Sequence, residues 1–293
     1  MLNPIGPHPA PESHIDDPPL ERLRVELADF LRSRRAELTP QAVGLPQTRR
    51  RRTPGLRREE VAELAGISTA LYAWLEQARP IPVSRHVLDS IASALQLSHD
   101  ERLHVHNLGR PATEEIEEEI TPALQRTVAS FTGHPAYVLD HGWDIVLEND
   151  AARLVFGDSS AEGECNLLKR VLTREETRSL LIDWEEAATA LVERFQFDFA
   201  AHAANPRMLA LAEELRANPM FDRVWSTHRV RRYTTKVMRI AHATAGELAF
   251  ESTTYRVVES PSLRLLLFTP FDKETAARLR ALCAKPQLAK AAT

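Results

Sequence analysis

The sequence predicts an all-α N-terminal domain of five helices, followed by an α+β domain with a five-stranded antiparallel sheet. Three observations support this prediction. A helix-turn-helix pattern spans Leu56–Ala78, an arginine-rich segment precedes it, and the β-rich runs lie in the second half of the chain. With 293 residues, of which 43% are hydrophobic, the chain is long enough for two cores.

The pattern of Leu56–Ala78 reads as two short helices joined by a tight turn. Apolar residues of the first helix recur three or four positions apart and therefore share one face. Gly66 follows at a point where a turn often needs positive φ, and Ser68 is suited to cap the second helix. Tyr72 and Leu75 are expected to pack back on the first helix. An ordinary helical hairpin within a larger bundle is the alternative interpretation.

The outward face of the second helix would enter the major groove of double-stranded DNA. Its predicted base-reading residues are Ser68, Thr69, Ala70, Ala73, Trp74 and Gln77. Ala70 and Ala73 can contact only thymine methyl groups, whereas Gln77 can read adenine. In the alternative, some of these apolar residues belong to the core.

Positive charge is concentrated just before this motif. From Arg22 to Arg58 there are eleven arginines and three acidic residues, although the whole chain carries a net charge of −4. Arginine keeps its charge and can bind phosphate with two hydrogen bonds. We therefore predict sequence-independent phosphate contacts from Arg49, Arg50, Arg51, Arg52, Arg57 and Arg58. A charge run of this kind is also typical of a solvated face or a disordered arm.

Three more helices complete the predicted DNA-binding domain, which spans residues 20–110. They are an amphipathic helix over Leu20–Arg35, a helix capped by Ser84, and a short helix that opens at Ser98. Residues 1–19 contain six prolines and are predicted to be a flexible tail. Residues 111–121 contain five glutamates and are either a linker or the start of a helix.

Residues 122–293 contain strand and helix patterns in a definite order. A helix over Ala123–Phe131 precedes two short strands, Ala136–Leu139 and Asp144–Leu147, with a turn at His141-Gly142. Helices are then predicted from Asn149 to Phe156 and over Asn166–Arg178, Ser179–Phe199 and Pro206–Ala217. Strands Tyr233–His242, Glu247–Val257 and Leu263–Phe268 and a helix from Asp272 to Ala284 follow. This order predicts an antiparallel sheet with helices on one side.

A sheet under a helical cover commonly holds a small-molecule pocket between its layers. The candidate pocket residues are Trp143, Asn149, Trp184, Phe195, Phe199, Trp225, His228, Arg231, Arg232, Tyr233 and Tyr255. A cation among His228, Arg231 and Arg232 could meet an anionic head group. The predicted ligand is apolar with a polar or acidic head, such as a fatty acid or a polyketide-like metabolite. Ordinary core packing of the aromatic residues, and exposed charges at a strand start, are the alternatives.

The motifs of common enzymes and metal sites are absent from the sequence. It has no G-x-S-x-G, H-E-x-x-H, C-x-x-C or glycine-rich phosphate loop. His99, His104 and His106 lie close together, but surface histidines explain them better than a metal site. We predict a protein that is not an enzyme and requires no cofactor. Two cysteines, no secretory signal and no membrane-spanning run predict a cytoplasmic location.

Several strings resemble a known family. GLPQTRRRRTPGLRREEVAELAGIS, LEQARPIPVS and VLDSIASALQLSHDERL resemble the Xre-type, lambda-repressor-like helix-turn-helix of the MmyB-like transcription regulators. WDIVLENDAARLVFGD, DWEEAA and FDRVWSTHRV extend the resemblance through most of the chain. The resemblance implies a PAS-like C-terminal domain that binds a small ligand. Ala78 and Ala243 depart from the family, which usually has Gly and Pro at these places.

These observations lead to one leading function and two alternatives. The leading prediction is a ligand-responsive, sequence-specific transcription regulator that acts as a homodimer, because one DNA-binding head reads few base pairs. The second keeps DNA binding but makes the C-terminal half a ligand-free dimerisation or protein-interaction module. The third is a hydrolase built on the C-terminal sheet.

Overall fold

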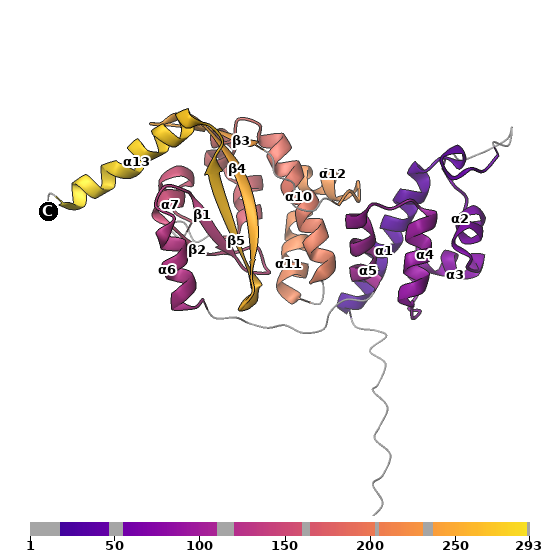
Figure 1. The fold of residues 1–293 in the computed structure, drawn as a ribbon. Coiled ribbons are helices and arrows are strands. Elements are labelled where there is room, and N and C mark those ends of the chain that lie inside the picture. The colour runs from indigo at the N-terminus through magenta and orange to yellow at the C-terminus, as the bar shows by residue number, and fades with distance from the viewer. Residues whose placement is uncertain are drawn as a thin grey trace, which may run out of the picture. The chain divides into compact units, whose positions relative to one another are not determined.

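The computed structural model describes residues 18–46, 55–109, 120–159, 165–202, 205–230 and 237–291. Contacts between Cα atoms divide the chain into two units, Met1–Gln96 with Leu108–Arg110, and Leu97–Asn107 with Pro111–Thr293. The first unit is helical and the second combines helices with a sheet (Figure 1). The predicted order of an all-α part and an α+β part is therefore confirmed.

The helices expected in the N-terminal region are all present. They are α1 (Pro18–Glu37), α2 (Arg58–Ala65), α3 (Thr69–Glu76), α4 (Arg85–Ala94) and α5 (His99–Gly109), with a short 3-10 turn, η1 (Pro40–Val43), after α1. Most of α5 falls into the second unit by its contacts, whereas the sequence predicts it as the last helix of the DNA-binding domain.

Local signals explain where the helices of the first unit begin and end. The Ser68 hydroxyl accepts a hydrogen bond from the Leu71 amide at 3.1 Å, and Ser84 does the same for Val87 at 3.2 Å. Gly66 ends α2 with φ of 65°, a left-handed conformation that favours glycine. The first unit buries side chains from each of its four α-helices: Leu23, Leu27, Phe30, Leu31, Val61, Tyr72, Leu75, Leu88 and Ile91.

The C-terminal sheet has five antiparallel strands in the order β2-β1-β5-β4-β3. The strands are β1 (Ala136–Leu139), β2 (Ile145–Glu148), β3 (Val237–His242), β4 (Gly246–Val257) and β5 (Ser260–Pro270). The predicted topology class is confirmed, and β5 extends beyond the predicted Leu263–Phe268 at both ends.

The second unit also holds α6 (Pro122–Ser130), α7 (Asp150–Phe156), α8 (Leu167–Thr173), α9 (Glu175–Leu180), α10 (Trp184–Ala201), α11 (Pro206–Leu215), α12 (Pro219–Trp225) and α13 (Lys273–Ala291). The helix predicted to begin at Ser179 begins instead at Trp184. Leu181 forms an isolated bridge with Ile240, and the Ile182 amide donates to the Arg239 carbonyl at 3.0 Å. Hydrogen bonds to the sheet edge override the helical pattern there.

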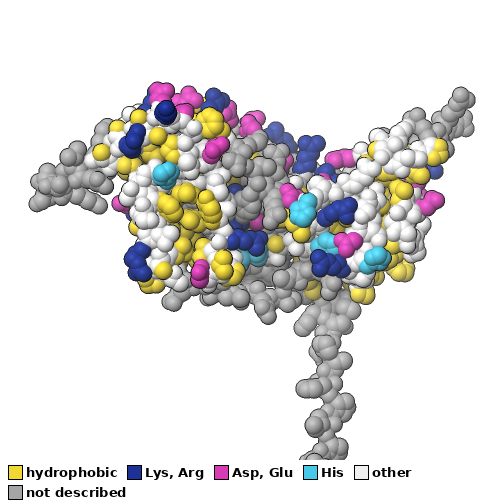
Figure 2. All heavy atoms as spheres, viewed as in Figure 1, with side chains coloured by type: hydrophobic (Ala, Val, Ile, Leu, Met, Phe, Trp, Pro, Cys, Tyr) yellow, Lys and Arg dark blue, Asp and Glu magenta, His cyan; other side chains and the backbone are white. Residues whose placement is uncertain are grey.

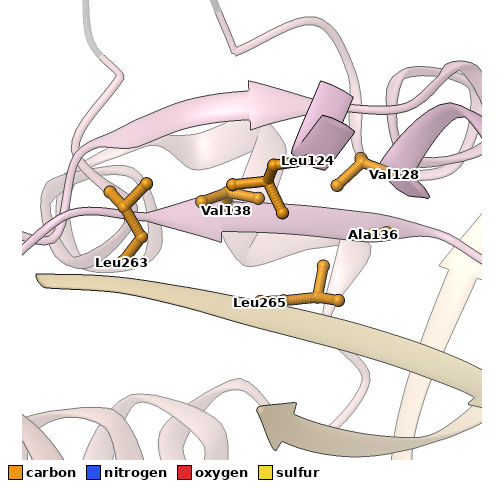
Figure 3. Close-up of a cluster of buried hydrophobic side chains, with 6 residues drawn as sticks. All are labelled: Leu124, Val128, Ala136, Val138, Leu263 and Leu265. Carbon is orange, nitrogen blue, oxygen red and sulfur yellow. The ribbon is translucent and has the colours of Figure 1, made fainter. Parts of the chain in front are cut away.

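Helices cover both faces of the sheet, so the prediction of helices on one side is wrong. Side chains of α6 pack on the face formed by alternate residues of β1 and β5, as Figure 3 shows. This cluster contains Leu124, Val128, Ala136, Val138, Leu263 and Leu265. Tyr137 and Leu266, which are paired in register, point to the other face. Because both faces of β1 and β5 are apolar, each needs its own cover.

Candidate DNA-binding and ligand-binding sites

The predicted base-reading residues lie on the solvent side of α3 or at its ends. Ser68, Thr69, Ala70, Trp74 and Gln77 are exposed, and Ala73 is half-buried. On the opposite side of the helix, Tyr72 and Leu75 are buried as expected. Trp74 keeps 40% of its surface exposed, with the Arg79 guanidinium 5.8 Å from the ring centroid. This arrangement leaves the predicted DNA-reading face open, and its contacts with bases remain a prediction.

The predicted phosphate contacts fall into three groups. Arg49–Arg52 lie outside the described residues. Arg57 is exposed directly before α2, and its amide donates to the Glu60 carboxylate at 2.7 Å. Arg58 is already engaged, because its Nε lies 2.5 Å from Oε2 of Glu76. Sequence reasoning missed this ion pair, which competes with a phosphate for Arg58.

A buried ion cluster joins the first three α-helices. Glu76, at the end of α3, is only 3% exposed. Arg35 of α1 donates to both of its oxygens, at 2.5 and 3.0 Å, and also to the Leu56 carbonyl at 2.9 Å. Burial acts to raise the pKa of Glu76, but hydrogen bonds from Arg35 and Arg58 outweigh it and lower the pKa. The cluster fixes the placement of α3 within its unit.

The residue after the C-cap of α3 carries a strained backbone. Ala78 has φ of 55°, in the left-handed region that glycine adopts without penalty. We expect Ala78→Gly to raise the free energy of unfolding by about 0.5–1 kcal/mol, measured by urea titration. Ala73→Gly, inside α3, should instead lower it by about 1 kcal/mol. Equal losses from the two variants would contradict strain at Ala78.

In the second unit, a cavity of about 130 Å³ is lined by the sheet face that carries Tyr137 and by residues of α7 to α10. Most of its lining is aliphatic or aromatic. The aromatic residues are Tyr137, Trp143, Phe156 and Phe268, and the charged ones are Arg170, Arg194 and Arg264. Charges of both signs are interspersed on the surface shown in Figure 2, whereas the described lining includes no acidic side chain. The cavity therefore suits an apolar molecule with a negative group.

Trp143 is the one described pocket candidate that the structure places in this lining. It is 1% exposed and has φ of 67°, a rare value for a large residue. Two hydrogen bonds hold its backbone in this conformation. The Trp143 amide donates to the Asp140 carbonyl at 3.2 Å, and the Trp143 carbonyl accepts from the Leu167 amide at 2.9 Å. Its indole Nε1 is buried and has no partner among the described residues. Such a donor is suited to a ligand oxygen.

The three arginines of the lining differ in their partners. Arg264 forms a buried ion pair with Asp198, and Arg194 donates to the Thr254 hydroxyl at 2.6 Å. Arg170 is 8% exposed and donates to the Phe156 carbonyl at 3.1 Å. Within the described ranges it has no carboxylate partner. The buried Glu148 carboxylate and Arg170 both act on the Tyr137 hydroxyl, so Arg170 has a negative charge in its surroundings although no direct ion pair joins the two. The guanidinium is therefore available for a direct ion pair with an anion.

Most of the other pocket candidates are packing residues. Phe195, Phe199 and Trp225 form an aromatic core with Phe221, with ring centroids 5.1 to 6.1 Å apart. The Trp184 indole donates to the Val171 carbonyl at 2.7 Å. These four candidates do not line the cavity, because helix–helix packing uses their rings.

The remaining candidates lie elsewhere. Asn149 caps α7 and accepts a hydrogen bond from the Ala136 amide, so its amide group holds the fold together. Tyr255 lies on the sheet face opposite the cavity and is 49% exposed. His228 is half-buried outside the lining, and residues 231–233, the candidates Arg231, Arg232 and Tyr233, lie outside the described ranges. The anion-binding candidates in the cavity are thus different arginines from those predicted.

Other kinds of site are not found in the described part of the chain. No group of three or more His, Cys, Asp or Glu side chains there could hold a metal ion. His141 and His202 form a close pair, with ring centroids 4.0 Å apart. Burial and the neighbouring His202 lower the pKa of His141 to about 4. Of the helices described, none is both long enough and apolar enough to cross a membrane.

Comparison with known proteins gives a family match for each half of the chain. The family model described as the MmyB-like transcription regulator ligand binding domain matches residues 120–282, which contain the whole sheet and the cavity. A helix-turn-helix domain matches residues 26–105, which contain α2 and α3. A search of curated proteins finds no match. The chain therefore belongs to the MmyB-like transcription regulators, with a helix-turn-helix DNA-binding domain followed by a ligand-binding domain.

Proposed function

We propose that this regulator binds its operator as a homodimer, and that an apolar acid in the C-terminal cavity changes its affinity for DNA. The DNA-binding part of the proposal rests on the open face of α3 and the basic segment that precedes α2. A homodimer follows from the small number of base pairs that one helix-turn-helix can read.

The ligand part rests on one observation, the buried Arg170 in an otherwise mainly apolar lining. The guanidinium is held by the Phe156 carbonyl and has no carboxylate partner among the described residues. A carboxylate in the cavity would supply a direct ion-pair partner for Arg170, and the aliphatic walls would cover an apolar body. A fatty acid or a similar metabolite meets this description.

Ligand binding can change DNA affinity only if the acid binds one conformation of the protein better than another. The lining combines residues of β1 and β5 with residues of α8, α9 and α10. An acid that fills this cavity would therefore favour one packing of these helices on the sheet. In the homodimer, we propose, that packing sets the relative placement of the two α3 helices.

The proposal is tested by operator binding with and without acids. A DNA site is selected from a random pool, and its affinity is measured with benzoate, hexanoate or tetradecanoate present. At least one acid should change the DNA affinity of the wild type but not the DNA affinity of the Arg170→Met variant. Arg239→Met, which removes an exposed partner of Asp183, should respond like the wild type. DNA binding that ignores every acid would favour the ligand-free dimerisation module.

The predicted phosphate contacts have their own signature. Replacing Arg49–Arg52 by alanine should weaken binding to all DNA sequences alike. It should also flatten the slope of log K against log salt by up to about 0.9 for each phosphate that the variant no longer neutralises. The measurement is fluorescence anisotropy at several salt concentrations, with Arg239→Ala as the control. A quadruple variant with an unchanged salt slope would refute the phosphate role.

A further inference from the structure

The backbone of Arg79, just after α3, is held in place by the end of that helix. Its amide donates to the Trp74 carbonyl at 3.0 Å, and the amide of Ala78 donates to the Leu75 carbonyl at 3.1 Å. These two bonds, with Ala78 in the left-handed conformation, form a Schellman motif. Arg79 is therefore fixed against the last turn of α3.

The chain that follows Arg79 is stiff as well. Pro80 and Pro82 fix their own φ angles and restrict the residue before each of them to extended conformations. Between the two prolines, the amide of Ile81 donates to the Arg79 carbonyl at 2.8 Å. A binding group on such a segment loses little conformational freedom when it meets its partner.

The side chain of Arg79 lies over the ring of Trp74. The guanidinium carbon is 5.8 Å from the ring centroid, a distance at which a cation and an aromatic ring attract each other. A Schellman motif often brings an apolar residue beyond the helix onto its last turn, and here the arginine takes that outer place. Arg79 is exposed, and it forms no salt bridge with any residue that the structure describes. Its charge is positioned but not neutralised by a carboxylate.

The place of Arg79 relative to α3 indicates what this charge would meet on DNA. The eight residues of α3 span about 12 Å, which is about the width of the major groove. When the N-terminal residues of a recognition helix contact base edges, its C-terminal end lies toward a wall of the groove. That wall is a row of phosphates. Arg79 comes after this end of the helix and lies beyond the base edges.

We propose that Arg79 binds a phosphate of the DNA backbone, and that Trp74 is a positioning residue that holds the guanidinium for this contact. The contact anchors the C-terminal end of α3 at the edge of the groove. Trp74, which the sequence predicts to read a base, then acts on affinity through Arg79 and not on the choice of sequence. The inference rests on the proposed function, because it requires α3 to enter the major groove.

The test is fluorescence anisotropy of the full-length protein with two DNA duplexes, an operator selected from a random pool and an unrelated sequence. Arg79→Ala should weaken binding to both duplexes about tenfold, as expected for the loss of a charged hydrogen bond. It should also flatten the slope of log K against log salt by about 0.9, the value for one phosphate. Arg239→Ala, which removes an exposed arginine of the second unit, should change neither quantity.

A double-mutant cycle separates positioning by Trp74 from base reading. Trp74→Ala should weaken binding to both duplexes about twofold to fivefold, the range expected for an exposed cation–π contact. Trp74→Phe should recover part of this loss, because it keeps an aromatic face under the guanidinium. In the Arg79→Ala background, Trp74→Ala should have no further effect. Circular dichroism checks that each variant is folded.

The opposite results would overturn the inference. If the two substitutions have additive effects and Trp74→Ala weakens only operator binding, Trp74 reads a base. An unchanged salt slope in Arg79→Ala would exclude the phosphate contact. If Arg79→Ala binds like the wild type while replacement of Arg49–Arg52 still flattens the slope, this inference fails and DNA binding stands. If the wild type binds neither duplex, the proposed function fails as well.

Discussion

Replacing Glu76 by alanine is expected to lower the free energy of unfolding of the first unit by about 3–5 kcal/mol. The carboxylate is 3% exposed and is the shared partner of Arg35 and Arg58. Without it, the half-buried Arg35 keeps its charge but loses its counter-ion. The loss is large because removing one member of a buried ion pair leaves the other charge poorly solvated. Urea titration followed by circular dichroism measures it.

The control is Glu63→Ala, which removes an exposed glutamate from α2. It should change the free energy of unfolding by less than about 0.5 kcal/mol. The double variant Glu76→Leu with Arg35→Met removes both charges and should recover much of the stability. An equal effect of Glu76→Ala and Glu63→Ala would show that the cluster contributes little.

The same carboxylate gives a pH dependence with a definite sign. Because hydrogen bonds from Arg35 and Arg58 keep the folded-state pKa of Glu76 below its ordinary value of 4.5, the folded protein releases this proton more readily than the unfolded chain. The stabilisation is complete above pH 4.5 and is lost as the pH falls through the folded-state value. The stability difference between wild type and Glu76→Gln should therefore shrink in acid.

Trp225→Ala should destabilise the second unit by about 3–5 kcal/mol, as truncation of a buried aromatic residue usually does. Trp225 is 1% exposed and stacks on Phe221, with ring centroids 5.1 Å apart, and it meets Phe199 edge to face at 5.2 Å. Its carbonyl also accepts a hydrogen bond from Gln196 at 3.0 Å. The ring belongs to the packing of α10 against α12, and thermal or urea unfolding measures its contribution.

Tyr255→Ala is the matched control, because Tyr255 is an aromatic residue of the same unit that is 49% exposed. It should cost less than about 0.5–1 kcal/mol. Neither residue lines the cavity, so the folded fraction of each variant should bind acids as the wild type does. Lost acid binding by folded Trp225→Ala would show that the aromatic core shapes the cavity.

Features that depend on near neighbours in the chain were predictable from the sequence. Ser68, Ser84 and Asn149 cap α3, α4 and α7 as expected, because a cap needs only an amide two or three residues away. Apolar periodicity located most helices and strands to within a few residues. It missed α12, and it missed the chain breaks at Arg174, between α8 and α9, and at Leu181, which bridges to β3. The family resemblance then identified both domains, which the family models confirm.

The site residues depend on distant parts of the chain, and there the sequence was less informative. Periodicity shows that Trp143, Phe195 and Trp225 are apolar and buried, but only Trp143 reaches the cavity. The sequence alone predicts Arg170 to be a solvated charge on a short helix. The packing of α8 against α7 and the sheet buries it. Glu76 likewise reads as surface until Arg35 meets it, 41 residues away in the chain.

The sequence by itself determined the helix-turn-helix, the antiparallel sheet and the regulator family. Hydrophobic periodicity, capping and the family's motifs each depend on residues that lie close together in the chain. The tertiary structure decided which arginines line the cavity, which aromatic rings form core, and that α6 covers a second face of the sheet. The physical reason is that burial and counter-ion partners are set by packing between distant segments. A pattern along one helix specifies its apolar face, but not the segment that will cover it.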